Sequence, residues 1–169
     1  MKKGMKLDLG GIAAGYAVDK GIDAIKKCGI NNALINAGGD IRVTGESENS
    51  KWKIGILHPR EENKLINTLT LKDISVTTSG DYRKYFVSGG KRYHHILNPN
   101  TGLPTEGVQS VTIIAPLAVD SDALATTVFV LGKNKGMELI EKLKDVEGII
   151  IDSDGLAIYS SGAKNYIHN

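Results

Sequence analysis

Apolar residues follow two different periodicities along the chain. Over residues 11–27 they recur every three or four positions and are followed by Gly29, which predicts an amphipathic helix that ends at the glycine. The same reasoning predicts two later helices, over residues 120–131 and 135–143. Elsewhere the apolar residues alternate with polar ones or form short continuous runs, which is typical of strands. The predicted strands are 33–36, 51–57, 65–71, 85–87, 92–96, 108–115, 148–151 and 156–159.

The order of these elements indicates the fold class. Strands occur in runs that few helices interrupt, so we expect an α+β fold with a mostly antiparallel sheet. Two pairs of neighbouring strands, 85–87 with 92–96 and 148–151 with 156–159, are separated by short glycine-containing turns and are predicted to be hairpins. No repeat, low-complexity tract or linker divides residues 1–169, and we therefore expect a single domain.

Composition excludes several classes of function. The 169 residues carry a net charge of +2, and the one basic cluster is Lys2, Lys3 and Lys6, which is too weak a field to indicate nucleic acid or a membrane surface. The single cysteine, Cys28, excludes an internal disulfide framework and a cysteine-rich metal site. No apolar run approaches the roughly 20 residues that span a bilayer, and none follows the basic start as in a signal peptide. As given, the chain is expected to be cytoplasmic.

A glycine-rich stretch, DLGGIAAGYAVD over residues 8–19, opens the first predicted helix. Paired glycines at a helix start let a ligand approach the backbone, and the free N–H groups there favour an anion. A tight turn with close helix packing is the more frequent explanation of such a stretch. The turn NAGGD at 36–40 and the predicted strand end TTSGDY at 77–82 offer similar clearings beside polar groups, although turns held by Asx hydrogen bonds are the commoner case.

Two adjacent histidines, His94 and His95, precede the rigid turn ILNPNTGLP. In an extended segment they point to opposite faces, so only one can face a given cleft. A histidine in a cleft could act as a general base near neutral pH, whereas a surface or packed histidine is more common.

Asp122 and Thr126 lie four residues apart on the second predicted helix and therefore share one face. A carboxylate and a hydroxyl are hard oxygen ligands that suit Mg²⁺ together with phosphate oxygens. The competing explanation, favoured by spacing alone, is that Asp120, Ser121 or Asp122 caps the helix while Thr126 lies on its surface. With the glycine turns and a histidine, these groups suit metal-assisted phosphoryl transfer.

Five stretches, in this order, resemble the FAD:protein FMN transferase family, also called ApbE-like flavin transferases. They are DLGGIAAGYAVD, NAGGD, TSGDYRKYF, HHILNPNTGLP and SDALATTVFVLG, and they extend over nearly the whole chain. The resemblance implies an α+β fold related to the T-fold. It also implies an Mg²⁺-dependent enzyme that cuts FAD, releases AMP and attaches FMN to a Thr or Ser hydroxyl of a partner flavoprotein, within a Ser/Thr-Gly-Ala-Thr-like site.

Site residues follow from the same resemblance. The implied metal ligands are Asp122, Thr126 and the main-chain oxygen of Gly11, and His95 corresponds to the general base for the acceptor hydroxyl, with Asp122 also counted as catalytic. His94 lies where the family varies. The positions that line the flavin pocket in the family are Asp8, Asn36, Gly38, Gly39, Ser79 and Ile96.

Two departures from the family pattern bear on function. Many relatives carry Lys where this chain has Ala14, and typical members are about twice as long, with an N-terminal half that helps close the FAD site. The chain could be a fragment, a natural short form completed by self-association or a partner chain, or a form that has lost part of the activity. Alternative functions are an Mg²⁺-dependent FAD pyrophosphatase and a non-catalytic flavin-binding module. Family members are often exported and membrane-anchored.

Overall fold

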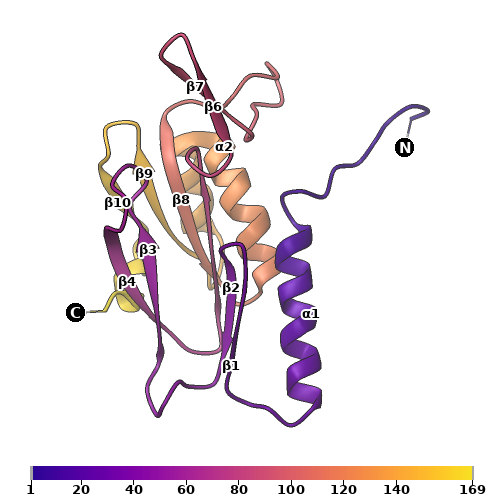
Figure 1. The fold of residues 1–169 in the computed structure, drawn as a ribbon, viewed down its shortest axis with the longest axis vertical. Helices are drawn as coiled ribbons and strands as arrows, with labels where there is room; N and C mark the ends of the chain where they lie inside the picture. Colours follow the sequence, from indigo (N-terminus) through magenta and orange to yellow (C-terminus); the bar gives the residue numbers. More distant parts are fainter. Residues whose placement is uncertain (1, 169) are drawn as a thin grey trace.

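The computed structural model describes residues 2–168, and within this range a six-stranded antiparallel sheet forms the centre of the molecule (Figure 1). Its strands run in the order β1-β2-β5-β8-β9-β10. Their bounds are Ala33–Ala37 (β1), Asp40–Thr44 (β2), Ser75–Gly80 (β5), Val108–Ala115 (β8), Glu147–Asp152 (β9) and Ala157–Tyr159 (β10). Every neighbouring pair is antiparallel, so the expected α+β fold with a mostly antiparallel sheet is confirmed.

The two faces of this sheet carry different partners. Helices α1 (Ala13–Lys27) and α2 (Ala118–Lys142) pack on one face, and the ribbon of β3 (Trp52–Leu57) and β4 (Leu65–Leu71) packs on the other (Figure 1). Side chains alternate between these layers along β8: Ile113 belongs to the cluster under α2, and Ile114 to the cluster under β3 and β4. This alternation is the two-residue period of a strand that is buried on both faces.

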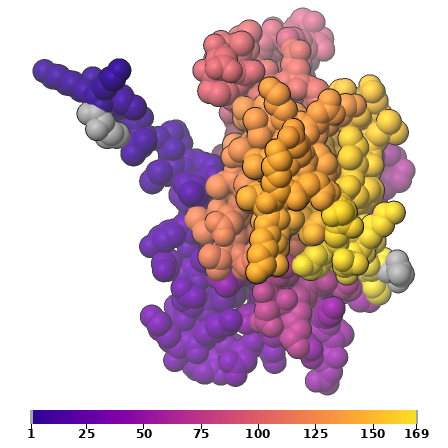
Figure 2. Space-filling view, turned by 180° about the vertical axis from the view of Figure 1, so that it is seen from behind, coloured from indigo at the N-terminus to yellow at the C-terminus, as the bar shows by residue number. Residues whose placement is uncertain are grey.

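Two segments extend from this layered body. The hairpin of β6 (Tyr85–Ser88) and β7 (Lys91–His94) stands at one end of the sheet, and residues 2–7 project away from the body (Figures 1 and 2). Gly89 and Gly90 both have positive φ, at 57° and 76°, as a two-residue hairpin turn requires. Both predicted hairpins are confirmed, since β9 also pairs with β10.

The predicted helices are largely confirmed. The first starts two residues later than expected. The second and third both lie within α2 and are separated at Gly132, whose φ of 77° and ψ of 175° are not helical. No helix in the described part of the chain is both long and apolar enough to cross a membrane.

The C-terminal segment packs against the body of the molecule. Residues Ala163–Tyr166 form a short 3-10 helix, η1, and Ala163 is fully buried against the core. The Ser160 hydroxyl and the Gly162 N–H both donate to the Glu147 carboxylate, which fixes the segment to β9.

Candidate functional site

The site is built where α1 and α2 cross. Positions spaced four residues apart in α1 and the turn before it face positions with the same spacing in α2, which runs in the opposite direction. The facing pairs are Gly11 with Thr126, Gly15 with Asp122 and Asp19 with Ala118. A side chain added at Gly11 would lie 3.5 Å from the Thr126 hydroxyl, and one added at Gly15 would lie 2.8 Å from the Cβ of Asp122. At the third step, Asp19 accepts a hydrogen bond from the Ala118 N–H at 2.9 Å. The two helices therefore form an antiparallel ladder, and Gly15 is required for their close approach.

Asp122 and Thr126 point from this ladder toward a cluster of oxygen atoms. The Thr126 hydroxyl lies 3.3 Å from the hydroxyl of Ser79 on β5. One oxygen of Asp122 accepts the Gly15 N–H at 2.9 Å. Nearby, the Thr77 hydroxyl lies 3.0 Å from that of Ser121. The structure thus brings together the three predicted metal ligands, Gly11, Asp122 and Thr126, beside Ser79.

The alternative explanation for this helix start, a local cap, is wrong. The N-cap position of α2 is Leu117, which makes no side-chain capping bond. Its first amides instead donate to Asp19 of α1, from Ala118 at 2.9 Å and from Val119 at 3.0 Å. Asp122 in turn accepts the N–H of Gly15 in the first turn of α1, so the anion at that helix start is a protein carboxylate. Local spacing could not indicate these caps, because each capping carboxylate is about a hundred residues from the amide that it accepts.

A second carboxylate, Asp40 at the start of β2, lies close enough to Asp122 to feel its charge. Burial of the carboxyl, and then the charge of Asp122, raise the pKa of Asp40 above its ordinary value of 3.8. The described residues contain no group of three His, Cys, Asp or Glu side chains arranged to hold a metal ion. A cation here would therefore rest on a carboxylate, hydroxyls and main-chain oxygen, and this hard-oxygen set fits Mg²⁺, which keeps few protein ligands.

The two histidines have different surroundings. His94 is buried with its ring against Phe129, and its Nε2 lies 2.9 Å from the Thr105 carbonyl oxygen. His95 is exposed, and its Nδ1 lies 3.3 Å from the Lys84 carbonyl oxygen. Because a carbonyl only accepts hydrogen bonds, this contact places the proton on Nδ1 and leaves Nε2 as the basic nitrogen. The expectation that only one of the two faces the cleft holds, and that one is His95.

Two adjoining cavities join His95 to the oxygen cluster. The first, of about 440 Å³, is lined by Asp8, Gly11, Ile96, His95 and Thr126 among others. The second, of about 470 Å³, is lined by Gly38, Ser79, Asp122, His95 and Thr126 among others. His95 and Thr126 line both, so the two cavities meet at these side chains.

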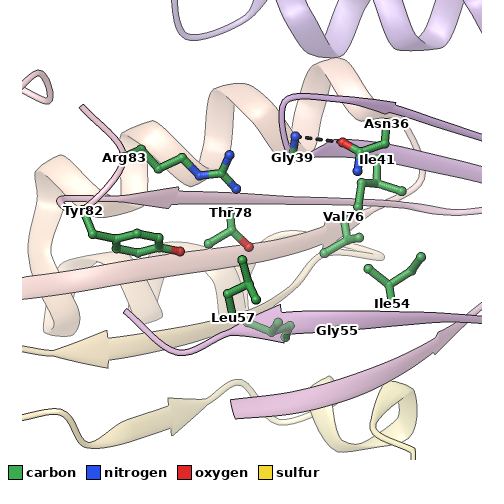
Figure 3. A pocket seen from close by; sticks show the side chains of 11 residues that line it. Asn36, Gly39, Ile41, Ile54, Gly55, Leu57, Val76, Thr78, Tyr82 and Arg83 are labelled. Carbon is green, nitrogen blue, oxygen red and sulfur yellow. Dashed lines mark hydrogen bonds between the residues drawn. The ribbon is translucent and has the colours of Figure 1, made fainter. Parts of the chain in front are cut away.

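Two of the predicted pocket residues do not reach this space. Asn36 and Gly39 line a third, smaller cavity of about 140 Å³ between the sheet and β3 (Figure 3). Asn36 there accepts the Gly39 N–H at 2.9 Å, the Asx-type bond that sequence reasoning gave as the common case (Figure 3). Asp8 makes a similar local bond to the Gly10 N–H, at 2.7 Å.

Sequence reasoning missed two basic residues at the cleft. Lys84 lines both large cavities, and Arg83 lines the second of them together with the small cavity of Figure 3. The Arg83 guanidinium donates to the Gly38 carbonyl oxygen, which fixes it over the NAGGD turn. The signal was present in the sequence, because both residues follow directly after the TTSGDY stretch.

Comparison with known proteins agrees with these features. The family model described as ApbE family matches residues 1–150. The chain is 39% identical to the FAD:protein FMN transferase of Klebsiella pneumoniae (strain 342), over 94% of this chain and 49% of that protein. It is 37% identical to the protein of the same name from Treponema pallidum, over 94% of this chain and 47% of that one.

Solved structures give the same result. The ApbE protein of Thermotoga maritima superposes with a TM-score of 0.91 at 40% identity, covering 99% of this chain and 55% of that one. The flavin transferase ApbE of Vibrio cholerae superposes with a TM-score of 0.82 at 32% identity, covering 95% and 52%. The chain spans about half the length of the relatives that it matches. By sequence and by fold, it belongs to the ApbE family.

Proposed function

We propose that the cleft transfers FMN from FAD to a Thr or Ser hydroxyl of a target flavoprotein, in an Mg²⁺-dependent reaction that releases AMP. The observation that carries this proposal is that one cavity is lined by an exposed histidine, His95, and by the carboxylate–hydroxyl pair of Asp122 and Thr126. The names of the relatives, FAD:protein FMN transferase, support the same chemistry.

In this reaction the acceptor oxygen bonds to the FMN phosphorus, the pyrophosphate P–O bond breaks, and AMP leaves with the bridging oxygen. Nε2 of His95 takes the proton of the acceptor hydroxyl, an effect worth roughly 10²–10⁴ in rate. Asp122, Thr126 and the Gly11 carbonyl would hold Mg²⁺, which when bound supplies charge neutralisation for the pyrophosphate. Arg83 and Lys84 add positive charge along the same cleft.

The acceptor is proposed to be a flavoprotein segment with a Ser/Thr-Gly-Ala-Thr-like sequence. A flexible acceptor segment needs an open approach to the base, and His95 is exposed on both cavities. The same openness admits water, so the pyrophosphatase alternative differs only in the nucleophile that His95 activates.

The test is to incubate the chain with FAD and Mg²⁺, with and without a protein that bears such an acceptor site, and to follow AMP, free FMN and acceptor mass. Transfer predicts AMP release together with an acceptor mass that rises by one FMN. Equal release of AMP and free FMN without acceptor would replace the proposal with a pyrophosphatase. Bound flavin with no AMP release would replace it with a binding module.

The matched variants for this test are Asp122→Asn and Asp120→Asn. Asn can still accept the Gly15 N–H but lacks the charge for a cation, so AMP release should fall about 100-fold or more, since a bound metal is worth several kcal/mol. Asp120 is exposed and lies two residues before Asp122, so its replacement should leave the rate unchanged. Equal rates in the two variants would contradict the metal assignment.

A further inference from the structure

Asp19 is a buried carboxylate that lies outside the cavities yet holds the start of α2. Its side chain is 7% exposed. One oxygen accepts the Ala118 N–H at 2.9 Å and a hydrogen bond from Arg42 at 2.6 Å, and the other accepts the Val119 N–H at 3.0 Å. A charged group with three donors on two oxygens has little freedom to move.

The first turn of α2 depends on this carboxylate. A helix start leaves four N–H groups without partners inside the helix, and the local N-cap residue, Leu117, supplies none. Asp19 satisfies two of them and places a negative charge at the positive end of the helix dipole. The position of the α2 start is therefore set from α1.

The two groups expected to hold the cation follow this helix start by one and two turns. One oxygen of Asp122 in turn accepts the N–H of Gly15 on α1, one turn before Asp19. The two carboxylates thus make crossed bonds, Asp19 to the start of α2 and Asp122 to the start of α1. Each carboxylate thus fixes the position of one helix start against the other helix, in the same ladder that carries Thr126.

Arg42 extends the same arrangement to the sheet. It lies on β2 two residues after Asp40, so both side chains are on the same face of the strand. Its ion pair with Asp19 is mostly buried, with the two side chains 15% and 10% exposed. Breaking one partner of such a pair leaves a buried charge uncompensated.

From these contacts we propose that Asp19 is a positioning residue, which holds Asp122 and Thr126 in the arrangement that binds a divalent cation. The proposal rests on the proposed function, because it presupposes a cation at that pair. Groups that orient metal ligands without touching the metal typically change its affinity 10- to 100-fold when they are replaced.

The chain offers a close control for a merely structural role. Asp152 is also buried and also accepts two backbone N–H groups, from Asp154 and Leu156 at 3.0 Å each. It pairs with one basic side chain, Lys133, at 2.9 Å. Asp152 lies on β9 and lines none of the cavities described above. Asp19→Asn and Asp152→Asn therefore remove comparable contacts, but only the first lies at the ladder.

The experiment measures Mn²⁺ affinity by the electron paramagnetic resonance signal of free Mn²⁺, for the wild type and for both variants, at a temperature where circular dichroism shows all of them folded. We expect Asp19→Asn to weaken Mn²⁺ binding about 10-fold or more, and Asp152→Asn to leave it unchanged. Amide hydrogen exchange at Ala118 and Val119 should accelerate in Asp19→Asn alone. Arg42→Gln, which keeps both caps, should weaken binding less than Asp19→Asn and covers the case in which that variant does not fold.

The outcomes separate the two proposals. If the wild type does not bind Mn²⁺, or if Asp122→Asn binds it equally well, the metal assignment fails. If the wild type binds and Asp19→Asn binds as tightly, or if Asp152→Asn weakens binding as much, the positioning role of Asp19 is wrong.

Discussion

The two faces of the central sheet are built on different principles. Toward β3 and β4, the buried residues are almost all apolar, with Leu69, Leu71 and Ile114 fully buried in one continuous cluster. Toward the helices, the apolar cluster around Phe129 gives way to buried hydroxyls and carboxylates where α1 crosses α2. The first face gains stability from area removed from water, whereas the second buries polar groups that must each find a partner. Chemistry is expected on the second face because reactive oxygen atoms are held there in fixed positions.

The largest expected effect comes from replacing the two adjacent histidines one at a time, because one is expected to act in chemistry and the other in packing. His95→Gln should lower the rate of AMP release about 10²–10⁴-fold, because the base is lost, while leaving the melting temperature unchanged. His94→Gln should instead lower the melting temperature, since His94 packs on Phe129, and leave the rate of the folded protein unchanged. Enzyme assays and thermal denaturation of both variants measure this. The opposite pattern would exchange their roles.

A cavity on the apolar face should act on stability alone. Leu69→Ala should lower the free energy of unfolding by about 2–5 kcal/mol, since Leu69 is fully buried. Urea denaturation gives this value, and Mn²⁺ affinity measured below the transition should match that of the wild type. A loss of affinity at full folding would mean that the two faces are coupled.

Crowding the helix ladder should affect both properties. Gly15→Ala would place a methyl group against the Ala118 carbonyl and the Asp122 side chain, and overpacking of this kind costs about 1–3 kcal/mol. The displaced Asp122 should also lower Mn²⁺ affinity.

Gly21→Ala, in the same helix, is the control for that variant. Its methyl group would meet the end of the flexible Ile35 side chain, so the better helix propensity of Ala should offset the contact. Denaturation and Mn²⁺ titration of the two variants decide the matter, and equal behaviour would show that the ladder tolerates displacement.

The smallest expected effect is on the pH dependence of stability, and it differs between the carboxylates of Asp40 and Asp73. The raised pKa of Asp40 means that its charge destabilises the fold as pH rises above 3.8, so Asp40→Asn should stabilise the protein at pH 7. Hydrogen bonds from the Gly45 N–H and the Thr44 hydroxyl hold the pKa of Asp73 below 3.8, so its charge stabilises the fold above that pH. Asp73→Asn should therefore destabilise the protein at pH 7, by about 0.5–1 kcal/mol.

Denaturation at pH 7 and at about pH 3 measures both effects. For Asp40→Asn the difference from the wild type should vanish below pH 3.8. For Asp73→Asn it should shrink as the pH falls through the lowered pKa. If both variants changed the free energy of unfolding in the same direction at pH 7, the contrast between the two carboxylates would be wrong.

These differences also explain how far sequence reasoning reached. Apolar periodicity predicted α1 and β8, because their packing is apolar and the period is visible along the chain, and glycine-containing turns indicated both hairpins. It did not predict β2 as a strand, and of β5 it indicated only the polar end. Buried β5 positions carry hydroxyls, such as that of Ser75, which donates to the Ala115 carbonyl at 2.6 Å. Hydrophobicity cannot signal a strand whose buried groups are polar and are satisfied by distant partners.

Site prediction had the same limit. The order of the motifs identified the family and singled out His95, Gly11, Asp122 and Thr126, which line the two adjoining cavities. The supporting contacts of Asp19 join residues about a hundred positions apart, so no local pattern contains them. The roles of the site residues, and the single domain over residues 1–169, stay predictions.

One measurement decides whether the oxygen cluster at the helix crossing is a metal site. Crystals soaked with Mn²⁺ would be measured at the manganese absorption edge, and an anomalous difference map would locate the ion. We predict a peak in the larger cavity, bonded to the Asp122 carboxylate and the Thr126 hydroxyl. A map without a peak in that cavity, or with the ion bound elsewhere, would contradict the metal assignment and the mechanism built on it.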